Sequence, residues 1–233
     1  MRRVIVTALA VVALATSAMA QSYDLFYVMP GQAGFKGIQA GIAAGDVGSI
    51  ADVGVVNLGG KYSISDMIEV GALAELGLLN DNLSTLSTIT VGAKYSLRET
   101  CAATVGLLVP TGDADDPGLS LGFMHTQYMG DMMINNWLQV GLLDGYTGGV
   151  GVNISLLVEP TLTFGDKITG YLDVLVATNT DDIAGDFLGI NLGPNVDIMI
   201  NDSAVVNVGV VVGVAGDAKA DDLGIGATFI TRL

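Results

Sequence analysis

The sequence predicts an all-β protein, a transmembrane antiparallel up-and-down β-barrel of about twelve strands. Three observations lead to this prediction. Hydrophobic residues make up 51% of the 233 residues and charged residues only 14%, yet beyond residue 20 no apolar run reaches the roughly 18 residues of a transmembrane helix. Apolar residues alternate with polar or small ones along most of the chain, which is typical of strands with two unlike faces. Most alternating segments are long enough for a tilted strand to cross a bilayer, which takes about 9–11 residues.

The first 20 residues are predicted to be a secretory signal peptide. A basic start at Arg2 and Arg3 precedes an apolar run over 4–15, and small residues lead to a cleavage site after Ala20. An N-terminal membrane anchor is the alternative, but this run is shorter than the roughly 20 residues that span a bilayer. Residues 21–35 show no pattern and are expected to form a short N-terminal segment. Residues 36–233 then form a single barrel domain.

The strands follow in order from the alternation. They are predicted over 36–44, 53–64, 67–79, 86–97, 101–110, 119–129, 136–144, 150–164, 168–178, 187–200, 203–215 and 222–232. The pattern is clearest over 203–215, where valines occupy alternate positions. It is weakest over 119–129, because His125 and Gln127 fall on the apolar face. Trp137 opens the segment 136–144 and is interpreted as an anchor at the membrane interface.

The predicted connections between strands alternate between two kinds. One kind is short, as at 65–66, 98–100, 165–167 and 201–202, with a longer member over 130–135. The other kind is longer and rich in Asp, and covers 45–52, 80–85, 111–118, 145–149, 179–186 and 216–221. If every connection joins neighbouring strands, the short turns lie at one end of the barrel and the long loops at the other, as in membrane barrels.

The polar faces of the strands are predicted to line the interior. The apolar faces carry almost no charge, whereas the opposite faces are rich in Gly, Thr and Asn with a few charged residues. A membrane barrel turns its apolar faces to the lipid, and a soluble barrel turns them inward, so the alternation by itself leaves both arrangements open. The content of the polar faces favours the membrane arrangement. The predicted lumen-lining residues are Asn57, Lys61, Glu69, Glu75, Lys94, Glu159, Asp173, Asp197, Asn207 and Arg232.

Together with the signal peptide and the alternating strands, the segment Gly60-Lys61-Tyr62-Ser63-Ile64-Ser65-Asp66, leading into Glu69-Val70-Gly71-Ala72, resembles outer-membrane β-barrel proteins of the porin or small-channel kind. The resemblance identifies no subfamily. It implies an outer-membrane location, with the long loops outside the cell and residues 21–35 in the periplasm. It also implies two partners, the outer-membrane lipids and the assembly machinery that reads the C-terminal strand. Such barrels usually end in an aromatic residue, whereas this chain ends in Leu233.

A barrel of twelve strands is wider than the eight-strand barrels that side chains fill, and many of its inward residues are Gly. This predicts a narrow channel for passive diffusion of ions or small solutes. Five inward acids face three inward bases, and acidic side chains in a lumen favour cations, so a weak cation preference is expected. Two alternatives stay open. One is a closed structural or adhesive barrel that acts through its acidic loops. The other is a secreted, soluble β-barrel that binds a ligand.

Other kinds of chemistry find little support in the sequence. No catalytic residue and no cofactor is predicted, because His125 is the only histidine and Ser120 lies on the opposite face of its strand. The net charge of −15 disfavours nucleic acid as a partner. Asp113, Asp115 and Asp116 are weak candidates for a metal, but they do not match a calcium loop and a solvated rim is favoured. Cys101 stands alone, which excludes a disulfide within the chain.

Overall fold

Twelve strands make up the computed structural model of the chain. It describes residues 36–44, 54–77, 86–111, 116–143, 151–179, 188–216 and 223–233. The predicted signal peptide and the segment 21–35 lie outside these residues. The strands are β1 (Lys36–Ala44), β2 (Gly54–Ser63), β3 (Ile68–Gly77), β4 (Leu86–Arg98), β5 (Cys101–Pro110), β6 (Gly118–Met129), β7 (Met132–Gly141), β8 (Asn153–Phe164), β9 (Ile168–Asn179), β10 (Gly189–Asn201), β11 (Ala204–Ala215) and β12 (Gly224–Arg232).

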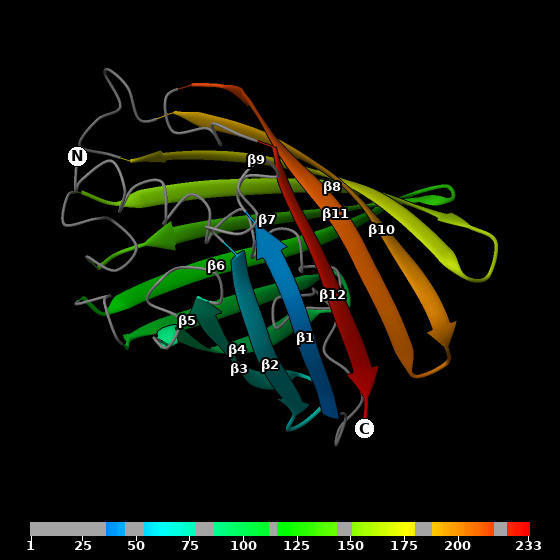
Figure 1. The fold of residues 1–233 in the computed structure, drawn as a ribbon, viewed down its shortest axis with the longest axis horizontal. Coiled ribbons are helices and arrows are strands. Elements are labelled where there is room, and N and C mark those ends of the chain that lie inside the picture. Colours follow the sequence, from blue (N-terminus) through cyan, green and yellow to red (C-terminus); the bar gives the residue numbers. More distant parts are fainter. Residues whose placement is uncertain are drawn as a thin grey trace.

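The strands form one closed antiparallel barrel. Each strand pairs with its neighbours in the sequence, and β1 closes the ring by pairing with β12. In the closing pair, Gly37 lies opposite Arg232 and Ala44 opposite Ile225. Figure 1 shows the two strands side by side, β1 in blue and β12 in red, with all strands tilted around the barrel. The predicted fold class, an up-and-down barrel of about twelve strands, is therefore confirmed. No helix in the described part of the chain is long and apolar enough to cross a membrane.

The short turns gather at one end of the barrel, as predicted. They join β2 to β3, β4 to β5, β6 to β7, β8 to β9 and β10 to β11, and the start of β1 and the end of β12 lie at the same end. The longer connections join the strands at the other end, and most of their residues lie outside those that the structure describes. The acidic rim predicted from those loops is therefore not described.

One connection differs from the prediction. The sequence predicts a connection over 130–135 and a strand over 136–144, but β7 begins at Met132, and Met129 pairs with Met132 around a turn of Gly130 and Asp131. Gly130 has a φ of 64°, which a glycine adopts without strain. The prediction was wrong because the start of β7, Met-Met-Ile-Asn-Asn, does not alternate apolar and polar residues. Pairing with β6 extends this strand in spite of that pattern.

The outer face of the barrel is apolar and exposed. Large hydrophobic side chains point outward from every strand, with Ile42 49%, Leu121 49% and Val208 40% exposed. The aromatic side chains of Tyr62, Tyr95, Phe164 and Phe229 are likewise exposed. Monomeric soluble proteins rarely expose large contiguous apolar surfaces. This distribution, apolar outside and polar inside, is that of a membrane barrel.

Candidate functional site

Polar side chains fill much of the inner face of the barrel. They occupy alternate positions on the strands, with the exposed apolar residues between them. Asn, Ser and Thr are the most frequent buried polar residues, and Glu69, Lys94, Glu159 and Asp173 are at most 2% exposed. Polar groups gathered away from the outer surface are unusual and need hydrogen-bond partners, so the inner face is the candidate functional site.

All ten predicted lumen-lining residues lie on this inner side of the strands. Asn57, Glu69, Lys94, Glu159, Asp173, Asp197 and Asn207 are buried. Lys61 and Glu75 are partly buried, and Arg232, at the end of β12, is exposed. Seven of these residues fall into two charged groups on different parts of the wall. Whether they line a conducting path stays a prediction.

The first group contains one carboxylate between two lysines. Lys94 Nζ on β4 lies 2.9 Å from Glu69 Oε1 on β3. Lys61 Nζ on β2 lies 3.7 Å from the other carboxylate oxygen, Glu69 Oε2. Ser63 donates a hydrogen bond to the same Oε2 atom, at 3.2 Å. The cross-strand register brings these residues together, since Glu69 lies opposite both Ser63 and Lys94. The side chains of Glu69 and Lys94 are fully buried, so this ion pair is screened little by solvent.

The second group places carboxylates among amides. Glu159 on β8 accepts hydrogen bonds from Asn135 Nδ2 at 2.7 Å and from Thr161 Oγ1 at 3.3 Å. Asp173 on β9 accepts one from Asn195 Nδ2 at 2.8 Å. Such hydrogen bonds to charged acceptors are stronger than those between neutral groups.

The same group continues onto β10 and β11. Asp197 accepts hydrogen bonds from Asn207 Nδ2 at 2.7 Å and from the Tyr171 hydroxyl at 3.4 Å, and Asn207 also donates to that hydroxyl. The acids of β8–β10 therefore lie apart from the Lys61–Glu69–Lys94 group of β2–β4, and the inner wall has two regions of different charge.

An apolar row crosses the inner wall between polar residues. Ala102 on β5 lies opposite Met124 on β6, Met124 opposite Trp137 on β7, Trp137 opposite Leu157 on β8, and Leu157 opposite Leu175 on β9. All five are buried and form one hydrophobic cluster with Leu73 of β3. We call these six residues the apolar row.

The position of Trp137 corrects its interpretation as an interface anchor. Because β7 begins at Met132, Trp137 lies in the middle of the strand, where it is 7% exposed and points inward. The sequence analysis missed the apolar row as a feature of the interior. The alternation of faces along a strand could have revealed the row, because residues two positions apart point to the same side. Leu157 therefore shares a face with Glu159, and Trp137 with Asn135.

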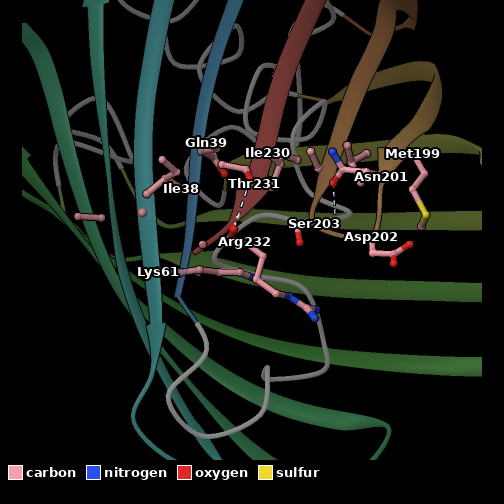
Figure 2. Close-up of a pocket in the computed structure, with 15 residues that line it drawn as sticks. Ile38, Gln39, Lys61, Met199, Asn201, Asp202, Ser203, Ile230, Thr231 and Arg232 are labelled. Atoms are coloured by element: carbon pink, nitrogen blue, oxygen red, sulfur yellow. Dashed lines mark hydrogen bonds between the residues drawn. The ribbon is translucent and has the colours of Figure 1, made fainter.

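A cavity of about 160 Å³ opens at the short-turn end. It lies between β1, β2, β12 and the β10–β11 turn, and Lys61, Arg232, Asp202 and Ser203 are among the residues that line it (Figure 2). A cavity of this size holds a few water molecules or a molecule about as large as benzene. Two of the three bases predicted to line the lumen, Lys61 and Arg232, therefore line this cavity at one mouth of the barrel.

The remaining candidates form no further site in the described part of the chain. His125 and Cys101 lie opposite each other on the outer face, whereas Ser120 points inward, as predicted. Across the described ranges, no three His, Cys, Asp or Glu side chains are grouped to hold a metal ion. Asp113 and Asp115 lie outside those ranges, and Asp116 is exposed.

Comparison with known proteins finds similarity in structure but not in sequence. No protein-family model matches the chain, and no curated protein matches its sequence. An outer-membrane channel from Pseudomonas putida F1 matches with a TM-score of 0.63 at 11% identity, over 88% of this chain and 98% of that one. The KdgM porin matches with a TM-score of 0.61 at 8% identity, over 84% and 99% of the two chains. This chain has the fold of outer-membrane channels. The NanC porin is also similar, with a TM-score of 0.55 at 8% identity over 85% and 99%.

Proposed function

We propose that this chain is an outer-membrane channel that lets small solutes or ions diffuse through a narrow interior. The observation that carries the proposal is the inverted distribution of side chains, with an exposed apolar outer face around a polar inner face. A closed barrel of this kind satisfies every strand edge and is one of the two structures that can span a bilayer. The similarity to solved outer-membrane channels and porins supports the same function.

The proposal includes an export route and an orientation. The predicted signal peptide, cleaved after Ala20, takes the chain across the inner membrane. The short turns then face the periplasm and the long acidic loops face outward, as is usual for such barrels. The lipids of the outer membrane contact the apolar face, and the assembly machinery reads β12.

A weak cation preference is the finer part of this proposal. The inner face carries Glu69, Glu75, Glu159, Asp173 and Asp197 against Lys61, Lys94 and Arg232. Acids in a lumen attract cations and repel anions. One acid is already shared between two lysines, so the preference rests on the acids of β8–β10.

A closed structural or adhesive barrel is the second candidate function. The observation that favours it is the dense interior, in which inward side chains on most strands are less than 10% exposed. In that case the acidic loops would carry the function and no solute would pass. The third candidate, a secreted soluble barrel, would have to leave the outer apolar face in water, which costs roughly 25 cal/mol per Å² of apolar surface.

Two measurements test the proposal. Heat-modifiability of the full chain on SDS gels, in the outer-membrane fraction, is expected to show a faster band before boiling. Proteoliposomes are then tested for swelling in a size series of uncharged solutes, with boiled protein as the control. Swelling with the smallest solutes supports the channel. A folded, membrane-embedded chain that passes none of them supports the closed barrel instead.

The cation preference is tested separately. A reversal potential across a KCl gradient reads the sign of the preference. Replacing Asp197 with Asn is expected to reduce any cation preference, because a neutral amide of the same size takes its place. A reversal potential of the opposite sign in the unmodified chain would contradict this part of the proposal and leave the channel itself unaffected.

A further inference from the structure

The register of β5–β9 separates the inner wall into three parallel rows. Toward the short turns, Thr126, Asn135 and Glu159 lie in direct cross-strand sequence. Toward the long loops, Gln139 of β7 lies opposite Ser155 of β8. The apolar row lies between these two polar rows. A solute that follows the inner face of β5–β9 from one end to the other must therefore leave polar groups, pass the apolar row and meet polar groups again.

Glycines bring the largest side chains of this row close to the wall. A Cβ atom added at Gly122 would lie 2.6 Å from Trp137 Nε1 and 2.3 Å from Thr104 Oγ1, so the indole lies directly over that glycine. In the same way, a Cβ atom at Gly59 would lie 2.9 Å from Leu73 Cδ1. Both large side chains are thus packed against backbone, and the apolar row is built from side chains held in fixed positions.

The apolar row extends beyond adjacent strands. Ala102, Met124, Trp137, Leu157 and Leu175 belong to five consecutive strands. Leu73 belongs to β3, and β4 separates it from the others, yet it is part of the same cluster. Leu73 therefore extends the cluster past β4 to a sixth strand.

We propose that the apolar row is a hydrophobic constriction that holds back hydrated ions and admits small uncharged solutes. This inference rests on the proposed channel function and names the class of solute that uses it. An ion that passes apolar side chains loses hydration that these side chains cannot replace, and hydrophobic constrictions in channels block ions by losing their water. A small uncharged solute loses far less on the same path.

Polar substitution within the row tests the inference. Leu157→Asn places an amide in the row with the same branched shape and the same number of side-chain heavy atoms. It is expected to raise the ion conductance of single channels in planar bilayers several-fold. Leu156→Asn is the matched control, because Leu156 is the preceding residue on β8 but points to the outer face, where it is 40% exposed. This control is expected to conduct like the unmodified chain. Met124→Gln supplies a second variant if Leu157→Asn assembles poorly, and heat-modifiability checks assembly of each.

Glycerol-driven swelling of proteoliposomes, measured on the same preparations, separates the possible outcomes. The constriction is supported by two results together. The unmodified chain lets glycerol in but carries little ion current, and Leu157→Asn or Met124→Gln carries more current. If ions already pass freely and neither variant changes the current, the constriction is wrong while the channel function stands. Equal increases in Leu156→Asn and Leu157→Asn would also contradict it. If neither glycerol nor ions pass through any folded variant, both the constriction and the channel function fail.

Discussion

At Gly122 the absence of a side chain leaves room for the indole of Trp137. We predict that Gly122→Ala displaces Trp137 and lowers the free energy of unfolding by about 1–3 kcal/mol, the usual cost of overpacking. Trp137 is the only tryptophan of the chain, so its fluorescence emission reports the displacement directly, and urea denaturation gives the stability.

Gly60→Ala is the control for this prediction. A Cβ atom at Gly60 would meet Gly37 O at 3.5 Å and Ile38 Cγ2 at 3.8 Å, which are ordinary contacts. The emission maximum is expected to stay unchanged and the stability nearly so. An equal effect of the two substitutions would show that the space over Gly122 has no special role.

Val208 tests which face of β11 meets the lipid. It lies between Val196 and Ala227 on the outer face. Val208→Arg is expected to reduce assembly, because an Arg on the lipid face costs about 2–4 kcal/mol near the midplane of the bilayer. The yield of heat-modifiable protein in the outer-membrane fraction measures the effect, with Val208→Thr as an uncharged control. Normal assembly of Val208→Arg would mean that this face is not in the bilayer.

Residue parity predicted the inward set from the sequence, because a strand turns alternate side chains to opposite faces. The partners of these residues could not be predicted in the same way. Lys94 meets Glu69, and Asp197 meets Asn207, through the register between neighbouring strands. A shift of register by one residue would move all these side chains to the other face, and the sequence alone does not give the register.

At the scale of the element, the turn between β6 and β7 depends on backbone conformation alone. Gly130 has a φ of 64° and no heavy atom within 4 Å of a Cβ atom placed on it. We predict that Gly130→Ala costs about 1–2 kcal/mol, the penalty of the left-handed region for a residue with a Cβ. Gly130→Asn should cost less, because Asn enters this region more readily. Urea denaturation of the two variants measures the difference, and equal losses would exclude the backbone explanation.

Most strand limits followed from the sequence within a few residues, and the exception has a physical cause. The alternation over 203–215 matches β11 (Ala204–Ala215) because valines mark one face of nearly the whole strand. For β7, the first five residues are apolar or amide-bearing without alternation, so the prediction placed the start four residues late and misassigned Trp137. These residues are held in a strand by hydrogen bonding with β6 and β8, which the local sequence pattern does not show.

At the scale of the whole molecule, closure depends on the contact between β1 and β12. Ala40 lies directly opposite Phe229, and opposite residues of antiparallel strands have Cα atoms about 4.5–5.5 Å apart, within reach of a disulfide. We predict that Ala40→Cys with Phe229→Cys, in a Cys101→Ser background, forms a disulfide on oxidation. The cross-linked chain is identified by its altered migration on non-reducing gels after boiling.

The control pair is Ala40→Cys with Val206→Cys. Val206 lies opposite Phe229 on β11, one strand farther from β1, so two strand spacings of about 4.8 Å each separate it from Ala40. No disulfide is expected there. Cross-linking of the control alone, or of neither pair, would contradict the closing contact.

The overall architecture was predictable because strand number and hairpin order determine an up-and-down barrel almost completely. The interior was predictable only in its chemistry. Which inward residues gather into the charged groups and which into the apolar row depends on contacts across several strands, as between Leu73 and the cluster on β5–β9. The residue pattern within a single strand does not predict such contacts between strands.

The pairing of β1 with β12 also sets the order in which the chain can fold. Gly37 and Arg232, which lie opposite each other, are 195 positions apart in the sequence, and contacts between such distant residues form slowly because long loops must close first. Before β12 pairs with β1, the edge of β1 is unpaired and the barrel is open. Unpaired strand edges and exposed apolar surface both promote aggregation. We therefore expect a chain that ends before β12 to aggregate more readily than the full chain.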